Sequence, residues 1–359
     1  MTNHLSVRLP RLAANFPTVA LATLPTPLST HELRIASVLR PLAVKHDEQS
    51  GPVYGGNKVR KLEYLLRWAL ERGASRIATY GAAGSNHALA TALYARRAGL
   101  ECTCLLSQQP VRAGIGRKLL AHQLNGTEIL CFGGPRSARV ALQRRCLQGR
   151  NLALIPMGGS NWRGALGFVN AALELAAQCR NGALAVPAEV YVATGTLGTA
   201  AGLALGFALA GLDVEVRAIR VTEPRFANAE ALRRLVQKTA ERMRRYDDAV
   251  PAGLAERCRV ELRGEFFGRG YGVSDEVTER AIALAAEELG IALEPTYSGK
   301  AMAALCHDLR TGSAVRPLFW NTANAVPLDV PAATEPDFTR LPPDFARYFD
   351  ARPGATSEA

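Results

Sequence analysis

Two lysines stand three residues apart where a glycine-rich turn is expected to run into a helix. Lys58 and Lys61 lie in the segment GGNKVRKLEYLL, residues 55–66, and the chain holds only six lysines among its 43 basic residues. A desolvated lysine beside another cation can lose its proton and form an imine, whereas an arginine does neither. The segment therefore suits amine chemistry at Lys58, although on its own it also fits the solvated start of a helix.

A loop rich in glycine and threonine follows an expected strand and opens an expected helix. Its residues are Gly195, Thr196, Leu197, Gly198 and Thr199. Glycines let the backbone approach an anion closely, and a helix N-terminus offers free N–H groups and the positive end of its dipole. The spacing matches neither a Walker loop nor a Rossmann loop. We interpret the segment as a phosphate-binding loop, with a tight strand–helix turn as the alternative.

Two further turns carry polar side chains at the start of expected helices. Ser85, Asn86 and His87 follow a strand, where hydroxyl, amide and backbone N–H groups can receive a carboxylate. A simple helix cap is the alternative there. Tyr297, in the segment Glu294–Met302, stands before a helix, from which its phenol can face a cavity or lie half-buried beside the cap.

These turns need a scaffold in which strands and helices alternate, and the middle of the chain predicts one. Extended, β-rich runs are expected at 76–80, 101–106, 128–132, 153–156, 189–193 and 214–221, and helical runs at 86–98, 115–124, 138–147, 163–179, 199–210, 228–246 and 275–289. This alternation is typical of parallel sheets covered by helices on both faces. The chain from Pro331 onward lacks an apolar period and is expected to be extended and packed along the surface near Phe345 and Tyr348.

Composition limits the class of protein. The 359 residues are 48% hydrophobic and 21% charged, as in globular proteins. No apolar run approaches the roughly 20 residues that span a bilayer, and no secretory signal is recognisable, so we expect a cytoplasmic protein without a membrane partner. The seven cysteines and six histidines show no metal-ligand spacing, so no metal is expected.

The net charge of +11 could indicate a nucleic-acid partner. The densest basic run, 233–245, lacks interleaved aromatic residues and is surrounded by acidic ones. We therefore interpret it as a solvated helix face and expect no nucleic acid. A basic protein also suits an anionic cofactor or a carboxylate substrate.

An imine-capable lysine, a phosphate loop and a carboxylate site on a parallel α/β scaffold are the parts that a pyridoxal-phosphate (PLP) enzyme needs. From about Pro25 to Leu328 the chain resembles the D-cysteine desulfhydrase / 1-aminocyclopropane-1-carboxylate (ACC) deaminase family, within the tryptophan-synthase-β-like PLP enzymes of fold type II. The segments that carry the resemblance are LPTPL at 24–28, GGNKVRKLEYLL at 55–66, Ser85-Asn86-His87, IPMGGSN at 155–161, GALG at 164–167, the 193–202 loop, Tyr271-Gly272-Val273 and Glu294–Met302.

The resemblance implies an α/β fold of two domains with open, mostly parallel twisted sheets. The large PLP-binding domain would be discontinuous, 1–61 plus 163–330, with a small domain at 62–162 and a C-terminal extension at 331–359. The active site would lie in a cleft between the domains. A homodimer that acts on a small amino acid is expected.

The resemblance also implies roles for single residues. Lys58 would carry PLP as a Schiff base and move protons. Lys61 would be a nearby second cation, and Asn57 would lie beside the Schiff base. The cofactor would be held by Asn86 at the ring hydroxyl, by Gly195 to Thr199 at the phosphate and by Thr322 at the pyridine nitrogen. Ser85, Asn86 and His87 would bind the substrate carboxylate, while Tyr297 and Ser298 would face the substrate. Lys58, Tyr297 and Ser85 would be the catalytic residues.

Three segments depart from the family pattern, and the first two named here fall near the expected site and bear on the substrate. Gly84 stands where a glutamine usually precedes the Ser-Asn pair, Asn321-Thr322-Ala323-Asn324 replaces His-Thr-Gly-Gly, and Lys45-His46-Asp47-Glu48 replaces Lys-Arg-Asp-Asp. ACC deaminases typically carry glutamate after the tyrosine, whereas Ser298 stands here, which favours desulfhydrase chemistry.

The expected reaction is the α,β-elimination of D-cysteine to pyruvate, ammonia and sulfide. The alternatives are ACC deamination, D-serine dehydration, racemisation, β-replacement and PLP binding without catalysis.

Overall fold

The structure is a computed structural model that describes residues 3–132 and 151–349. Its contacts group the chain into two compact units. The larger unit joins Met1–Tyr64 to Ser160–Val326, and the smaller unit joins Leu65–Gly159 to Pro327–Ala359. Helix α3, Lys58–Glu71, passes from the larger unit into the smaller one.

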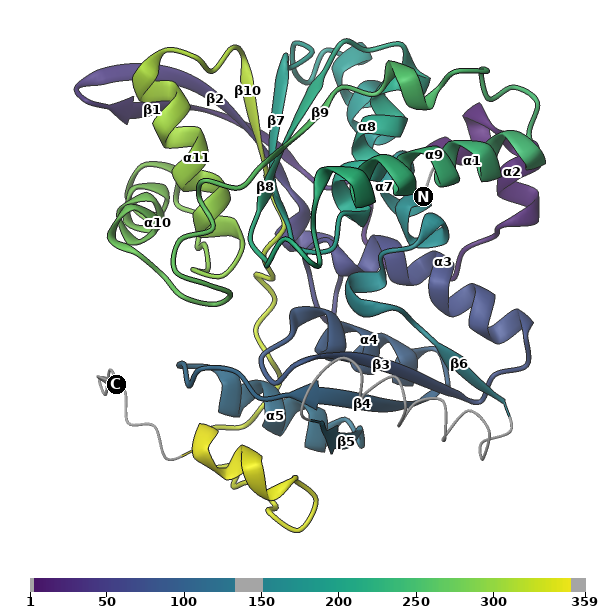
Figure 1. Cartoon of the computed structure of the whole chain (residues 1–359), viewed down its shortest axis with the longest axis vertical. Helices are drawn as coiled ribbons and strands as arrows, with labels where there is room; N and C mark the ends of the chain where they lie inside the picture. Colours follow the sequence, from purple (N-terminus) through teal and green to yellow (C-terminus); the bar gives the residue numbers. More distant parts are fainter. Residues whose placement is uncertain (1–2, 133–150, 350–359) are drawn as a thin grey trace. The chain divides into compact units, whose positions relative to one another are not determined.

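The larger unit is built on a six-stranded sheet in the order β1-β2-β10-β7-β8-β9 (Figure 1). Strands β1 and β2 pair antiparallel, and all other neighbours pair parallel. The strands are β1 Leu28–Ile35, β2 Val38–His46, β7 Glu189–Thr194, β8 Glu215–Arg220, β9 Val260–Arg263 and β10 Pro317–Asn321. Every residue of the central strand β7 is buried, which explains its continuous apolar run.

Helices cover both faces of this sheet. One core cluster joins Val190, Val192 and Val216 to helices of one face: α1 His4–Arg8, α2 Pro10–Asn15, α7 Trp162–Arg180, α8 Gly198–Ala210 and α9 Ala229–Tyr246. A second cluster joins Tyr191 and Ile219 to the helices of the other face, α10 Glu276–Leu289 and α11 Ser298–Thr311. Successive strand residues point to opposite faces, so neighbours along β7 enter different clusters.

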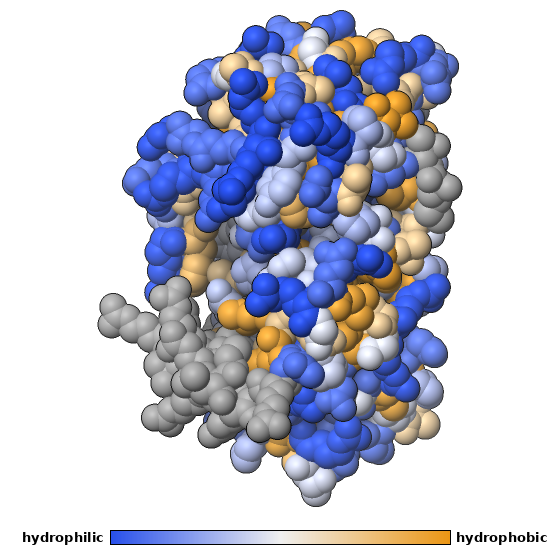
Figure 2. All heavy atoms as spheres, turned by 90° about the vertical axis from the view of Figure 1, so that its right-hand side faces the viewer, coloured by the Kyte–Doolittle hydropathy of each residue, from blue (hydrophilic) through white to orange (hydrophobic). Residues whose placement is uncertain are grey.

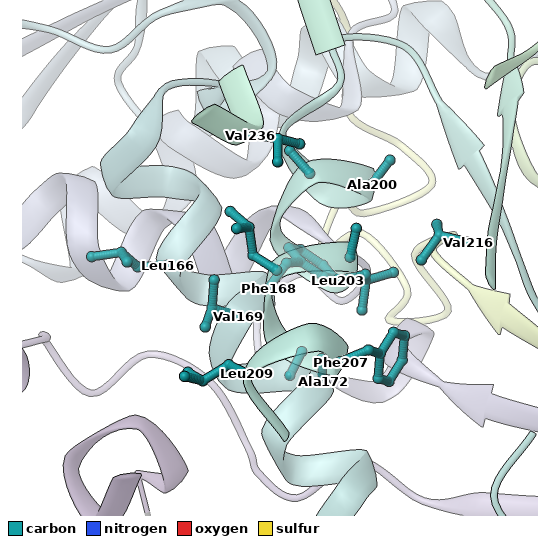
Figure 3. Packing of buried hydrophobic residues seen from close by; sticks show 14 of the residues in the cluster. Leu166, Phe168, Val169, Ala172, Ala200, Leu203, Phe207, Leu209, Val216 and Val236 are labelled. Carbon is teal, nitrogen blue, oxygen red and sulfur yellow. The ribbon is translucent and has the colours of Figure 1, made fainter. Parts of the chain in front are cut away.

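Helices α7 and α8 approach each other very closely, and Figure 3 shows their side chains packed together. A side chain on Gly202 would collide with the carbonyl oxygen of Ala165, and one on Gly206 would lie 2.5 Å from the Cβ of Ala172. Glycine is therefore required at both positions. This packing fixes where α8 begins, and with it the 195–199 loop.

The smaller unit holds a four-stranded parallel sheet in the order β5-β4-β3-β6. Its strands are β3 Arg76–Ala82, β4 Glu101–Ser107, β5 Glu128–Cys131 and β6 Leu152–Leu154, and its helices include α4 Asn86–Arg97 and α5 Ile115–Leu124. The C-terminal segment forms a 3₁₀ helix over Pro343–Tyr348, which buries Phe345 and Tyr348.

The expected parallel α/β fold is confirmed, and the expected strands and helices occur within one or two residues of their predicted bounds. The exception is the helix expected at 138–147, which lies outside the described residues. The expected packing of the C-terminal segment near Phe345 and Tyr348 is confirmed, because both rings are buried. The expectation of an extended backbone is wrong at Pro343–Tyr348, which forms a 3₁₀ helix. Short 3₁₀ turns also occur at Asp47–Gln49, Met157–Gly159 and Ala255–Arg257.

None of the helices in the described part of the chain combines the length and apolar character needed to cross a membrane. On the face shown in Figure 2, hydrophilic residues are widespread and hydrophobic ones lie between them in several groups.

Candidate active site

Lys58 is the first residue of α3, and a tight turn before it fixes where the helix begins. A side chain on Gly55 would collide with the carbonyl oxygen of Glu48, so only glycine fits there. Gly56 has a φ of +84°, which favours glycine, and it also packs against neighbouring backbone. The side chain of Asn324 accepts a hydrogen bond of 2.6 Å from the N–H of Gly55. The turn is thus held on several sides and presents Lys58 at the helix start.

The segment after β10 differs from the family pattern, and its two asparagines hold the backbone. Asn321 is fully buried and accepts a hydrogen bond of 3.2 Å from the N–H of Ala323. The side-chain oxygen of Asn324 accepts hydrogen bonds from the N–H groups of Gly55 and Val326. A side chain on Gly56 would lie 2.6 Å from the carbonyl oxygen of Thr322, so this segment also requires glycine there. The departures at 321 and 324 therefore have a structural use in shaping the turn.

The Lys58 amine lies in a polar and aromatic setting. Its Nζ donates a hydrogen bond of 2.7 Å to Asn57 Oδ1, and Asn57 Nδ2 donates one of 3.0 Å to Thr199 Oγ1. The same Nζ lies 5.9 Å from the centroid of the Tyr297 ring. Burial lowers the pKa of Lys58 to about 8, against the opposing attraction of the Glu294 carboxylate. A useful fraction of the amine is therefore neutral and nucleophilic near neutral pH.

Ser160 connects the second lysine to the loop before α8. Lys61 Nζ donates to Ser160 Oγ at 3.4 Å, and that oxygen lies 2.8 Å from Thr196 Oγ1 and 3.2 Å from the N–H nitrogen of Gly198. Burial and the charge of Lys58 lower the pKa of Lys61 well below its ordinary value. Ser160 stands in the IPMGGSN segment, but the sequence did not single it out as a site residue.

The 195–199 loop has the backbone of an anion site. Leu197 has a φ of +70°, so the chain turns sharply just before α8 begins at Gly198. A side chain on Gly198 would lie 2.6 Å from Ser160 Oγ, and one on Gly195 would lie 3.2 Å from Cε1 of Tyr297. The predicted loop residues thus come together with Ser160, Lys61 and Tyr297 in the larger unit.

Two tyrosines share a hydrogen bond beside this loop. The hydroxyl oxygens of Tyr271 and Tyr297 lie 2.6 Å apart, and their rings meet edge to face. Burial raises the pKa of Tyr271 to about 12 and, together with Tyr271, raises the pKa of Tyr297 well above its ordinary value. Both phenols therefore keep their protons at neutral pH. The sequence identified Tyr297 as a site residue, whereas Tyr271 was used only to recognise the family.

The turn that positions Tyr297 is built around the carboxylate of Glu294. Its Oε1 accepts hydrogen bonds of 2.8 Å from the N–H groups of Tyr297 and Ser298, and its Oε2 accepts one of 2.9 Å from Thr296. Ser298 is buried, and its hydroxyl accepts a hydrogen bond of 3.0 Å from the N–H of Glu294. The Ser298 hydroxyl thus takes part in closing the turn.

The predicted carboxylate residues lie together in the smaller unit. Ser85 caps α4 by accepting a hydrogen bond of 3.2 Å from the N–H of Ala88. Asn86 Oδ1 accepts one of 2.6 Å from Lys118 Nζ, which the sequence did not identify. His87 is buried, with its Nε2 3.1 Å from Thr79 Oγ1.

The arrangement in the larger unit fits a phosphorylated aldehyde. It offers an amine of lowered pKa, buried phenols, and a helix N-terminus lined by hydroxyl groups and a lysine. Nowhere in residues 3–132 and 151–349 do three or more His, Cys, Asp or Glu side chains gather in a way that would hold a metal ion.

Comparisons with known proteins agree with this chemistry. The family model described as "Pyridoxal-phosphate dependent enzyme" matches residues 19–317. The D-cysteine desulfhydrase of Klebsiella pneumoniae (strain 342) is 36% identical over 304 residues, which cover 81% of this chain and 88% of the relative. That of Salmonella choleraesuis (strain SC-B67) is 35% identical over 302 residues, with the same coverage.

Solved structures give the same answer for the fold. An ACC deaminase homologue superimposes with a TM-score of 0.75 and 28% identity, covering 91% of this chain and 96% of the other. A T.th. threonine deaminase has a TM-score of 0.60 at 21% identity, covering 90% and 99% of the two chains. The fold is that of the fold type II enzymes, and the chain belongs to the family of pyridoxal-phosphate-dependent enzymes.

Proposed function

We propose that the enzyme removes the β-substituent of a small D-amino acid, with D-cysteine as the first substrate. The α C–H bond breaks, the Cβ–S bond follows, and water converts the remaining fragment to pyruvate and ammonia while sulfide departs. The curated relatives named D-cysteine desulfhydrase support this choice. The observation that carries it is the Lys58 amine, of pKa about 8, facing the ring of Tyr297.

Lys58 and the loop before α8 are proposed to hold the cofactor. Lys58 provides the covalent link, and the backbone and hydroxyl groups of Gly195 to Thr199 bind the phosphate, supported by the Ser160 contacts. Thr322 is proposed to meet the pyridine nitrogen, and Asn86 the ring hydroxyl. When bound, pyridoxal phosphate delocalises the electrons left on the α-carbon after its proton departs.

The remaining roles concern protons and the substrate. Lys58, once released, takes the α-proton, because its lowered pKa suits a general base near neutral pH. The phenol of Tyr297 has a raised pKa and keeps its proton, and it is proposed to donate that proton toward the departing sulfur. Ser85 and His87 are proposed to bind the substrate carboxylate at the start of α4. Ser298 then acts on the substrate indirectly, through the turn that holds Tyr297.

A substrate screen of the purified holoenzyme tests this function. D-Cysteine and β-chloro-D-alanine should release pyruvate, whereas ACC should be turned over poorly. No carboxylate follows Tyr297, and both oxygens of Glu294 are occupied by backbone N–H groups. Efficient turnover of ACC, or no elimination from any β-substituted alanine of either hand, would overturn the proposal.

Replacing Gly198 with valine should weaken cofactor retention. The new side chain would collide with Ser160, whose hydroxyl contacts the phosphate loop. We expect the bound cofactor to be lost during dialysis, as measured by visible absorbance. Ala210→Val is the control, because Ala210 is only half-buried and lies at the far end of the same helix. Full occupancy in Gly198→Val would place the phosphate elsewhere.

Replacing Tyr297 with phenylalanine should lower kcat by roughly 10²-fold, the usual scale for a positioned proton donor. The ring stays while the hydroxyl bonded to Tyr271 is lost, so cofactor absorbance should remain. Tyr246→Phe is the matched control, because the Tyr246 ring packs on Phe16 and lies on α9. Equal rates for Tyr297→Phe and the wild type would remove the phenol from the mechanism.

We also propose, from the family resemblance, that the enzyme works as a homodimer in the cytoplasm on a free amino acid. Light scattering of the holoenzyme tests the assembly, with a monomer mass as the contradicting result.

A further inference from the structure

Gly84 stands where the family pattern usually has a glutamine, and the side-chain amide of another glutamine, Gln109, lies beside it in the smaller unit. Gly84 lies immediately before Ser85, and its φ is not in the left-handed region, so its backbone would accept a side chain. A Cβ built there lies 3.2 Å from Gln109 Nε2 and 3.3 Å from Gln109 Oε1. The amide of Gln109, from the loop after β4, therefore stands beside the place that a side chain at 84 would take.

One hydrogen bond orients this amide, and two more hold the backbone of Gln109. Gln109 Oε1 accepts a hydrogen bond of 3.0 Å from the N–H of Gly84. With the oxygen engaged there, the NH₂ group remains as a donor, and it bonds no acceptor within residues 3–132 and 151–349. The backbone of Gln109 is held by the Tyr348 hydroxyl, which accepts from its N–H at 2.8 Å and donates to its carbonyl oxygen at 2.9 Å.

Tyr348 belongs to the C-terminal segment, and that segment is firmly packed. Tyr348 is 4% exposed, and its carbonyl oxygen would lie 2.8 Å from a side chain on Gly116, in the first turn of α5. Arg117 donates to the carbonyl groups of Leu328 and Val330 in the same segment. The C-terminal segment thus reaches the carboxylate-binding turn through Gln109.

The surroundings of the free donor favour an anion. The turn opens α4, whose first N–H groups carry the positive end of the helix dipole. Lys118 Nζ lies 3.0 Å from the carbonyl oxygen of Gly84 and 2.6 Å from Asn86 Oδ1, adding a positive charge to the same turn. A neutral amide donor beside these groups suits one oxygen of a carboxylate.

We propose that Gln109 donates a hydrogen bond to the substrate α-carboxylate, taking the place of a residue-84 side chain, and that Tyr348 positions it. The inference rests on the proposed function, since it concerns the substrate of that same reaction. Gln109 is then a specificity-determining residue, and Tyr348 is a positioning residue supplied by the C-terminal segment.

Gln109→Ala tests the contact. The Michaelis constant for D-cysteine should rise about tenfold or more, the scale of a lost hydrogen bond to a charged group, while kcat and cofactor absorbance change little. Gln108→Ala is the matched control, because Gln108 is the same residue type one position earlier and is exposed. Gln109→Glu should bind still more weakly, because it places a negative charge against the carboxylate.

Two more variants separate recognition from structure. Tyr348→Phe should raise the Michaelis constant in the same direction by a smaller factor, because the loop loses its two hydrogen bonds to the hydroxyl. Gly84→Gln combined with Gln109→Ala should recover part of the lost affinity, because the alanine frees the space for an amide at 84. Equal constants in Gln109→Ala and Gln108→Ala, or a fall in kcat and absorbance instead, would overturn the proposal.

A wild-type enzyme that does not eliminate D-cysteine would contradict the proposed function but leave this test available. Binding of D-alanine, which carries the carboxylate but no leaving group, is then followed by the change in cofactor absorbance. A dissociation constant raised about tenfold in Gln109→Ala and unchanged in Gln108→Ala would support the contact, and equal constants would remove it.

Discussion

Replacing Lys58 with arginine should reduce turnover by about 10³-fold or more and abolish covalent attachment of the cofactor. Arginine keeps the positive charge at the start of α3 but cannot form an imine or lose its proton under working conditions. Burial lowers the pKa of the native amine to about 8, which suits it to both proposed tasks. Pyruvate release measures the rate, and the visible absorbance measures the attachment.

Borohydride reduction followed by peptide mapping identifies the attachment site directly. The label should appear on the peptide that contains Lys58. Lys61, Lys118 and Lys300 serve as internal controls, because they lie at other positions: Lys61 within α3, Lys118 on α5 and Lys300 on α11. A label on any of these three instead of Lys58 would contradict the proposed attachment site.

The parts of the candidate site that the sequence predicted are those formed within one short segment. The turn before Lys58 and the loop before α8 each need glycine for close backbone contacts, so their composition shows in the sequence. Ser160, Lys118 and Gln109 were missed because their partners are distant along the chain. Ser160 meets Thr196 36 residues away, and Gln109 meets Tyr348 239 residues away. Such pairs exist only once the fold is formed.

The fold was predicted best where local patterns are strong. The alternating strands and helices carry long apolar periods, whereas α1 and α2 have only five and six residues. These short helices depend on burying Leu5 and Leu12 in the core of the larger unit. The β1–β2 hairpin was also missed, because its turn uses Ala36 and Ser37 at φ values of +48° and +66°. The usual turn signal, asparagine or glycine, is absent there.

Four buried charged side chains form one cluster in the larger unit, and one of them, Arg60, belongs to the first turn of α3. Arg60 Nη2 lies 2.8 Å from Asp47 Oδ1 and 3.0 Å from Glu174 Oε1, and Lys45 Nζ lies 2.6 Å from Glu174 Oε1. Each side chain is at most 2% exposed. Two positive and two negative charges cancel, and Arg60 stands two residues after Lys58. This cluster therefore ties α3 to β2, to the 3₁₀ turn at Asp47–Gln49 and to α7.

Replacing Glu174 with glutamine should lower the free energy of unfolding by about 3 kcal/mol at pH 7, because the cluster keeps an uncompensated buried cation. Burial alone would raise the pKa of Glu174, but the charges and hydrogen bonds of Arg60 and Lys45 outweigh it and lower the pKa to about 2. A lowered pKa in the folded state means that the stabilisation is fully present above the ordinary value of 4.5. It is lost as the pH falls from there toward 2, so the difference between wild type and Glu174→Gln should shrink over that interval.

Urea unfolding followed by circular dichroism measures both effects. Glu276→Gln, which removes an exposed pair with Arg280, should change stability by no more than about 0.5 kcal/mol. An equally small change in Glu174→Gln would mean that the buried charges do not stabilise the start of α3.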